Sequence, residues 1–349
     1  MRMTGKKGVL LVNLGTPDAP TRSAVYRYLK QFLLDPRVID YPWLQRNLLV
    51  RGIIVPFRSG SSAKLYKKLW TSEGSPLKVY GERLAEGVAR ELGEEYSVEL
   101  AMRYQNPSIE KAINRFKAEN ISSLMVLPLF PQYASASTGS VHDEVMRLLR
   151  KQQVIWPVNF INSFFRDENM VDVFVKNARQ FDLASYDHIL FSYHGLPERQ
   201  LKKGDFSQSH CLKKKDCCSS LCLENQFCYS AQCFSTTYAI AEKLGLSKED
   251  YSICFQSRLG REEWVKPYTP VVLKDRAAKG DKRILVFCPA FVSDCLETTI
   301  EISEEYAEEF EEMGGETLDL VPSLNDDPDW IRGVAELVRS KEVREVVLG

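Results

Sequence analysis

The sequence predicts an α/β protein made of two Rossmann-like domains, each a doubly wound parallel sheet of four strands. Short apolar runs alternate with stretches of helical periodicity along the 349 residues, which is typical of βαβ units. Eight such runs occur, four in each half of the chain. The expected strands are residues 9–13, 98–102, 124–127 and 154–161 in the first half, and residues 188–193, 252–255, 284–287 and 317–321 in the second.

Two motifs recur in the same order in both halves. The first and fifth runs end in the pattern x-x-Gly-x-Pro, at residues 13–17 and 193–197. The third and seventh runs continue into PLF at residues 128–130 and PAF at residues 289–291. Chance is the alternative explanation, because Gly and Pro are frequent where strands meet loops. The shared order favours an ancient duplication, with domains at residues 1–165 and 166–349.

The duplication makes Leu14 and His194 equivalent positions. Open α/β sheets bind ligands beyond the carboxyl ends of their strands, so we expect these residues on opposite walls of a cleft between the halves. One wall is then apolar and the other basic. A flat and mostly apolar ligand suits both walls.

Composition excludes several classes of protein. Lys and Arg number 46 and Asp and Glu 47, and this balance gives no support to nucleic-acid binding. No run approaches the ~18 apolar residues that span a bilayer, and the first residues do not resemble a signal peptide. Neither a Walker motif nor a G-x-G-x-x-G motif occurs. We therefore expect a cytoplasmic protein.

A histidine turn and an acidic helix are the main candidate site. His194 ends an expected buried strand, and Gly195 lets the backbone turn sharply after it. A helix from residue 293 to about 313 is expected to open with a capping box formed by Asp294 and Glu297. Glu297, Glu301 and Glu305 follow one another at steps of four, whereas the glutamates of 308–312 are expected to face solvent. This pattern predicts a site that takes up protons and passes a metal ion.

The segment 41–92, between the first two expected strands, begins with large apolar residues mixed with arginines at 41–57. An ordinary amphipathic helix packed on the core is the favoured interpretation. The alternative is an apolar lip beside the cleft that rests on a membrane surface.

Six of the nine cysteines cluster in a segment at residues 205–233. They are Cys211, Cys217, Cys218, Cys222, Cys228 and Cys233. Disulfides are rare in a cytoplasmic protein, so the cluster indicates metal binding. Four thiolates can hold zinc or an iron–sulfur cluster, and both remain open, although the spacing lacks the strict C-x2-C pairs of zinc ribbons.

Ordered motifs across nearly the whole chain resemble the ferrochelatase family, whose members insert Fe²⁺ into a porphyrin to make haem. They are residues 12–17 (VNLGTP), 32–36 (FLLDP), 74–77 (GSPL), 102–104 (MRY), 131–133 (PQY), 192–197 (SYHGLP), 255–260 (FQSRLG) with Trp264, and 291–297 (FVSDCLE). The resemblance implies two chelatase-like domains around a porphyrin cleft. It also implies a lyase of haem biosynthesis that acts on protoporphyrin IX or coproporphyrin III.

The resemblance implies roles for single residues. His194 and Glu297 match the pair that handles iron and protons in the family, and Glu301 and Glu305 match its acidic iron path. The positions around the porphyrin are matched by Leu14, Arg103, Tyr104, Tyr133 and Trp264. A base can accept the two pyrrole protons that leave as Fe²⁺ enters, carboxylates can guide the cation, and rigid walls can distort the macrocycle.

Two features of this chain qualify the resemblance. Cys295 stands where many members have a histidine, which leaves His194 as the main base. The cysteine-rich segment resembles an internal [2Fe–2S] site of some bacterial members. Its expected ligands are Cys211, Cys218, Cys228 and Cys233, with Cys217 as a rival. The other functions considered are insertion of cobalt or nickel into another tetrapyrrole, and a haem or iron–sulfur carrier that binds without turnover.

Overall fold

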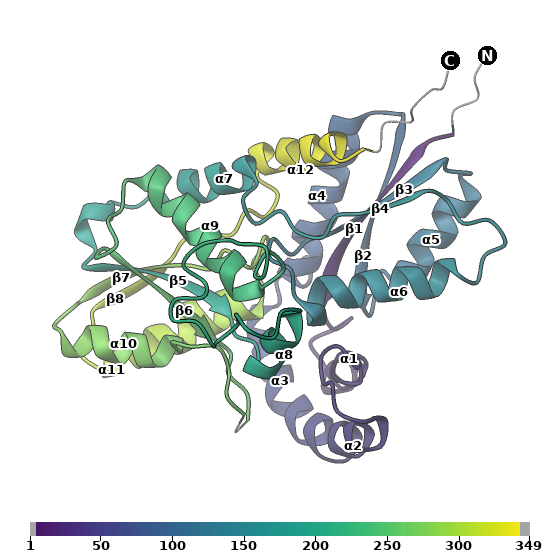
Figure 1. Ribbon diagram of the computed structural model, residues 1–349. Helices are drawn as coiled ribbons and strands as arrows, with labels where there is room; N and C mark the ends of the chain where they lie inside the picture. Colours follow the sequence, from purple (N-terminus) through teal and green to yellow (C-terminus); the bar gives the residue numbers. More distant parts are fainter. Residues whose placement is uncertain (1–4, 261, 343–349) are drawn as a thin grey trace. The chain divides into compact units, whose positions relative to one another are not determined.

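The computed structural model describes residues 5–260 and 262–342, which form two compact units (Figure 1). Unit 1 contains the described residues up to 130, residues 135–163 and residues 326–342. Unit 2 contains residues 131–134 and the described part of 164–325. Each unit is built around its own four-stranded parallel sheet, as the sequence predicts.

The sheet of unit 1 has the strand order β2-β1-β3-β4. Its strands are β1 (Lys7–Gly15), β2 (Tyr96–Tyr104), β3 (Ser123–Pro128) and β4 (Val158–Phe160). The helical segments are α1 (Arg22–Leu33), α2 (Trp43–Leu49), η1 (Val50–Ile54), α3 (Val55–Leu69), α4 (Pro76–Leu92), α5 (Ile109–Ala118), η2 (Ser135–Gly139), α6 (Ser140–Leu149) and α12 (Pro328–Ser340). Apolar residues of β1 and β3 pack against α5 and α6, so the central strands are buried and read as continuous apolar runs.

The sheet of unit 2 has the equivalent order, β6-β5-β7-β8. Its strands are β5 (His188–His194), β6 (Tyr251–Gln256), β7 (Arg283–Phe287) and β8 (Thr317–Leu320). The helical segments are α7 (Glu168–Ala178), η3 (Leu183–Ser185), α8 (Glu198–Gly204), α9 (Tyr229–Leu244), α10 (Thr269–Ala278), η4 (Leu296–Tyr306) and α11 (Ala307–Glu312). Apolar residues of β5 and β7 pack against α10, η4 and α11.

The two sheets repeat one another in detail, as a duplication requires. In each sheet the first strand in sequence lies between the second and the third. The amide of Met102 in β2 donates to the carbonyl of Pro107, and the amide of Phe255 in β6 donates to that of Pro267. A π-helical segment follows the third strand of each unit, η2 in unit 1 and η4 in unit 2.

The close approach of strand ends explains the glycine in each x-x-Gly-x-Pro motif. Gly15 has φ +123°, and a Cβ placed on it would lie 2.1 Å from the carbonyl oxygen of Tyr104. Gly195 donates its amide to the carbonyl of Gln256, and a Cβ there would lie 2.9 Å from that oxygen. Any larger residue would push the two strand ends apart.

Two expected boundaries differ from the structure. β4 covers only residues 158–160, because Pro157 has no amide hydrogen and Val154 and Ile155 are exposed. The last helix, α12, lies beside α4 of unit 1, and the compact units therefore divide the chain differently from 1–165 and 166–349 (Figure 1). This packing depends on Gly87 of α4, where a Cβ would lie 2.5 Å from Ile331 of α12.

Candidate active site

His194 is the last residue of β5 and is half-buried. Its Nδ1 atom lies 2.7 Å from the carbonyl oxygen of Gly195. A carbonyl oxygen can only accept a hydrogen bond, so Nδ1 carries the proton and Nε2 carries the lone pair. The backbone oxygen of His194 accepts a hydrogen bond from the Tyr229 hydroxyl at 2.9 Å. The backbone thus engages Nδ1, and Nε2 is the ring nitrogen left to act on a ligand.

Trp264 is the aromatic neighbour of His194 in unit 2. The centroids of the two rings are 6.2 Å apart and the rings are tilted by 44°. The backbone of Trp264 forms a β-bridge with Pro197, and a Cβ on Gly195 would lie 3.1 Å from the indole ring. The small residue after His194 therefore lets the indole approach the strand end.

The acidic helix is π-helical from Leu296 to Tyr306, which sequence periodicity did not predict. The expected capping box of Asp294 and Glu297 is wrong by one position. The N-cap is Cys295, and its partner is Thr298, whose hydroxyl accepts the Cys295 amide at 2.9 Å. Asp294 instead accepts a hydrogen bond from Asn325 at 2.7 Å. π-helical turns are rare and are frequent at functional sites.

The glutamates of this helix become more exposed along the chain. Glu297 and Glu301 are half-buried, whereas Glu305 is exposed. Burial, and next the charge of Glu297, raise the pKa of the Cys295 thiol well above its usual value. Cys295 therefore stays protonated and donates its S–H to the Glu297 carboxylate.

Three donors fix the carboxylate of Glu301. Oε2 accepts from Gln256 Nε2 at 3.0 Å and from the Ser257 hydroxyl at 2.6 Å, and Oε1 accepts from the Tyr306 hydroxyl at 3.0 Å. Burial, and next the charge of Glu301, raise the pKa of Tyr306 well above its usual value, so this phenol remains a donor. Glu301 is thus positioned more tightly than a solvated glutamate on a helix face.

Gln256 joins the histidine strand to the acidic helix. It is the last residue of β6, is 1% exposed, and pairs in register with His194. Its Nε2 donates both to the Glu297 carbonyl at 2.9 Å and to Glu301, and its Oε1 accepts from Ser192 at 2.8 Å. Sequence reasoning gave this residue no role of its own. A glutamine that ends an apolar strand is the signal that could have identified it.

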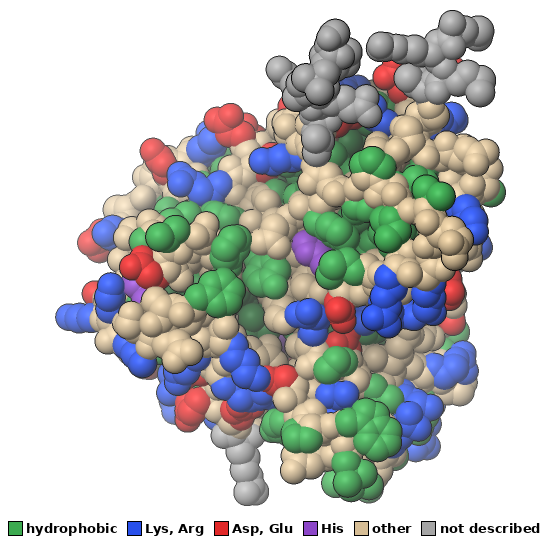
Figure 2. All heavy atoms as spheres, turned by 45° about the vertical axis from the view of Figure 1, so that its right-hand side comes forward, with side chains coloured by type: hydrophobic (Ala, Val, Ile, Leu, Met, Phe, Trp, Pro, Cys, Tyr) green, Lys and Arg blue, Asp and Glu red, His purple; other side chains and the backbone are tan. Residues whose placement is uncertain are grey.

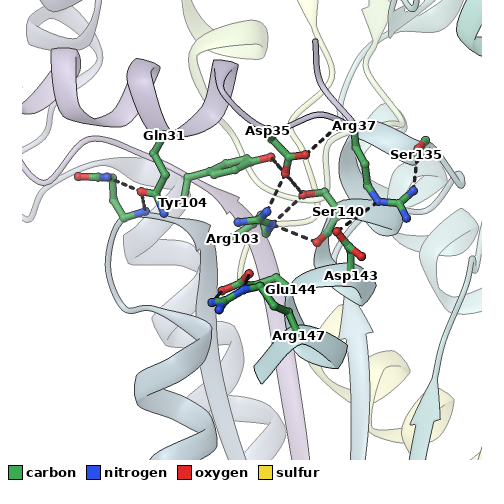
Figure 3. A network of polar contacts seen from close by, with 11 residues as sticks. Gln31, Asp35, Arg37, Arg103, Tyr104, Ser135, Ser140, Asp143, Glu144 and Arg147 are labelled. Atoms are coloured by element: carbon green, nitrogen blue, oxygen red, sulfur yellow. Dashed lines mark hydrogen bonds and ion pairs between the residues drawn. The ribbon is translucent and has the colours of Figure 1, made fainter. Parts of the chain in front are cut away.

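Arg103 and Tyr104, two of the sequence-predicted residues of unit 1, meet in a separate network around Asp35 (Figure 3). The Asp35 carboxylate accepts from Arg103 at 2.7 Å, from the Tyr104 hydroxyl at 2.9 Å and from Ser140 at 2.5 Å. Arg103 also donates to the Ser140 hydroxyl at 2.7 Å. Leu14, at the end of β1, is half-buried. The network locks the strand β2 to the start of α6.

Tyr104 differs from the expectation of a ligand-facing residue. Its side chain is 0% exposed, and burial raises the pKa of its hydroxyl well above the usual value. In this structure it supports Asp35 and Arg103 from within the core. Tyr133, in unit 2, is half-buried and its backbone amide donates to Gln232 at 2.7 Å.

The cysteine-rich segment runs from the end of α8 into the start of α9, and its cysteines are free thiols. The thiols of Cys211 and Cys218 donate to the sulfur of Cys228 and hold the pKa of Cys228 well below its usual value. Cys217 lies 3.8 Å from Cys218, sulfur to sulfur. Cys233 is fully buried inside α9 and pairs with the hydroxyl of Tyr229. The structure therefore groups Cys217 with Cys211, Cys218 and Cys228.

An imidazole and a row of carboxylates at the carboxyl edge of a parallel sheet make this an α/β protein with a candidate site for protons and a metal cation. A model of the ferrochelatase family matches residues 6–342. A ferrochelatase of Coxiella burnetii (strain Dugway 5J108-111) is 45% identical over 343 residues, covering 97% of this chain and 95% of that protein. A ferrochelatase of Azotobacter vinelandii is 45% identical over 333 residues, covering 95% and 98%.

The chain belongs to the ferrochelatase family. It is a metal–porphyrin chelatase of haem biosynthesis, as the sequence predicts. The fold also resembles the sirohydrochlorin chelatase SirB from Bacillus subtilis in complex with cobalt, with a TM-score of 0.53 at 11% identity, over 96% of this chain and 95% of that one. Within residues 5–260 and 262–342, no helix is long and apolar enough to cross a membrane.

Replacing Gln256 by Leu should impair both stability and turnover. The change removes the side-chain donor to the Glu297 carbonyl and one of the two partners of the Ser192 hydroxyl, which keeps Thr269, and the loss costs about 2 kcal/mol. We expect at least a tenfold loss of kcat for porphyrin metallation, because the acidic helix is no longer tied to the histidine strand. Urea denaturation and steady-state kinetics measure the two effects. Ser257→Ala is the control, since it removes one donor to Glu301 and keeps Gln256. Wild-type kcat in Gln256→Leu would contradict the assignment.

Proposed function

We propose that this enzyme inserts Fe²⁺ into protoporphyrin IX or coproporphyrin III and that His194 is the base for the pyrrole protons. The observation that carries the proposal is the fixed tautomer of His194, whose Nε2 is available as a proton acceptor at a strand end. A free porphyrin carries two pyrrole N–H groups, and both protons leave as Fe²⁺ binds the four nitrogens. His194 Nε2 accepts a proton directly, and the Glu297 carboxylate is the second acceptor.

Glu301 and Glu305 form the proposed path for iron. The cation first meets Glu305, which is exposed, and then Glu301 and Glu297, which are half-buried. Carboxylate oxygens are suitable ligands for Fe²⁺ that still carries water. The three donors that fix Glu301 keep its carboxylate oriented while the cation passes.

Leu14, Arg103, Tyr133 and Trp264 are the proposed porphyrin contacts. Each is half-buried, so each has surface to offer a ligand. Trp264 stands beside the proposed base and provides a flat apolar face for the macrocycle. Tyr104 acts on the porphyrin only through Arg103, because its own side chain is buried. Rigid contacts of this kind bend the macrocycle and expose its nitrogen lone pairs.

A [2Fe–2S] cluster is the proposed cofactor of the cysteine-rich segment. Cys211, Cys217, Cys218 and Cys228 are the proposed ligands, and Cys233 is replaced by Cys217 because it is paired inside α9. Four sulfurs on one zinc ion lie about 3.8 Å apart, since each Zn–S bond is about 2.3 Å. Among the described residues, no three of these sulfurs lie within 4.8 Å of one another. This spread supports a cluster of two irons, which supplies a one-electron redox centre when bound.

A membrane contact is proposed for α2, η1 and the start of α3. The apolar lip comprises Trp43, Leu44, Leu48, Ile53 and Phe57, all more than half exposed. Figure 2 shows apolar side chains gathered at the bottom of the view, where Figure 1 places α2. Residues 41–72 contain six Lys or Arg and no Asp or Glu. An apolar surface with basic neighbours is suited to an anionic membrane surface.

Removing the proposed base should nearly abolish metallation. We expect His194→Ala to lower kcat/KM by about 10²–10⁴, the usual contribution of a positioned general base. Glu297→Gln should also lower kcat, and Glu305→Gln should raise KM for Fe²⁺ with KM for porphyrin unchanged. Glu308→Gln, on the exposed face of α11, is the matched control. The assay follows metalloporphyrin absorbance with each porphyrin in turn. Full turnover by His194→Ala would eliminate its proposed role.

The cluster ligands can be separated by two substitutions. Anaerobically purified wild-type protein should be brown and contain about two irons and two sulfides per chain. Cys217→Ser should lose this colour, and Cys233→Ser should keep it. A brown Cys217→Ser variant beside a colourless Cys233→Ser variant would restore Cys233 as the ligand. A colourless wild-type protein that contains zinc would rule out the cluster.

Two substitutions test the apolar lip. We expect the double variant Trp43→Ser, Phe57→Ser to bind anionic vesicles at least tenfold more weakly, because each side chain loses apolar area that enters the lipid interface. Cosedimentation with phosphatidylserine vesicles measures the binding. Phe206→Ser is the matched control, since Phe206 is 86% exposed but lies outside the apolar lip. Equal weakening by the control would argue against the lip as the contact.

A further inference from the structure

The cysteine-rich segment contains a second group of metal-binding side chains. The donor atoms of His210, Cys222 and Glu224 all lie within 4.8 Å of one another. They combine one nitrogen, one sulfur and one carboxylate oxygen. None of the three belongs to the four proposed cluster ligands. This group is therefore a candidate for a separate function.

His210 is buried but incompletely satisfied. The residue is 8% exposed, and its Nε2 lies 3.8 Å from the sulfur of Cys222 and 3.0 Å from the carbonyl oxygen of Cys217. Its Nδ1 is buried and has no hydrogen-bond partner within the described part of the chain. Buried ring nitrogens are normally paired, so this imidazole is placed at some cost in free energy.

A buried asparagine holds the backbone of Cys222 in place. Asn225 is 2% exposed, and its Oδ1 accepts the backbone amide of Cys222 at 2.7 Å. Its Nδ2 donates to the carbonyls of Cys217 at 2.9 Å and Ser220 at 2.8 Å. The loop that carries Cys222 is thus fixed beside His210. Preorganised donors lose little conformational entropy when an ion binds.

The thiol of Cys222 already faces the other two donors. It donates to the Glu224 carboxylate, and this hydrogen bond holds the pKa of Glu224 below its usual value. The same sulfur is near His210 Nε2. The Cys222 proton now links the thiol to the Glu224 carboxylate. A cation at this position would take the place of that proton and would contact all three side chains.

We propose that His210, Cys222 and Glu224 bind a borderline-soft divalent cation of the Zn²⁺ or Fe²⁺ class. Imidazole, thiolate and carboxylate are the donors that such ions share, whereas Mg²⁺ and Ca²⁺ favour oxygen ligands alone. Binding through His210 Nε2 moves the ring proton from Nε2, which faces the Cys217 carbonyl, to the unpartnered Nδ1. It also converts the Cys222 thiol to a thiolate and releases that proton to water, with no change of oxidation state. Three protein ligands leave one position open, and Glu224 is exposed, so the ion exchanges with solvent.

Cobalt(II) is the probe that tests the site, because its thiolate complexes absorb visible light. The full-length protein with its native cluster is treated with a chelator and then titrated with CoCl₂. We expect a sulfur-to-cobalt charge-transfer band in wild type and in the control Glu249→Gln. Cys222→Ser should lose the band, and His210→Ala and Glu224→Gln should weaken cobalt binding at least tenfold. His194→Ala should keep the band, which separates this site from the active site.

Iron and sulfide content of the same samples distinguishes this site from the cluster. If Cys222→Ser loses the cluster, Cys222 is a cluster ligand and the mixed-donor site is overturned. If Glu224→Gln binds cobalt as tightly as wild type, the site is also overturned. Glu224 is exposed, so this variant should fold even where His210→Ala does not. If wild type lacks a cluster but Glu224→Gln binds one cobalt fewer, the cluster proposal fails and this site is supported.

Discussion

The hydrogen bonds of Gln256 are the interaction on which the candidate active site of unit 2 depends. They connect the end of β6 to Ser192 of β5 and to Glu297 and Glu301 of η4. A neutral amide suits this position, because it can accept from a hydroxyl and donate to a carbonyl and a carboxylate at once. The proposed base and the proposed iron path therefore share one rigid frame.

In unit 1 the corresponding contacts between strand end and helix are made by charged side chains, Arg103 and Asp35. Arg103 follows Met102 in β2 as Gln256 follows Phe255 in β6, and each donates to the segment that follows the third strand of its sheet. In unit 1 the Asp35 carboxylate also accepts from Arg103 and from Tyr104. The duplicated fold thus places a polar junction at the same point of both sheets. One junction orients the carboxylate of Glu301, on the proposed iron path, and the other holds Arg103, whose guanidinium suits an anionic group.

In the cysteine-rich segment, tertiary contacts distinguish cysteines that the sequence alone does not. Six thiols at irregular spacing gave no unique set of four ligands. Burial of Cys233 beside Tyr229 removes one candidate, and His210 with Glu224 engages Cys222. Of the four remaining thiols, Cys211 and Cys218 contact the sulfur of Cys228, and Cys217 lies beside Cys218. Spacing alone could not predict this, because the loop folds around Asp205 and Asn225.

The sequence by itself determined the eight strands, the two-sheet architecture and the position of His194 at a strand end, because apolar periodicity and Gly-Pro turns are local signals. Only the tertiary structure decided the π-helical form of η4, the burial of Tyr104, the role of Gln256 and the packing of α12 on α4. Each of these depends on partners distant in the sequence. Local propensity does not determine that Tyr104 is buried in the core whereas its neighbour Arg103 remains partly exposed.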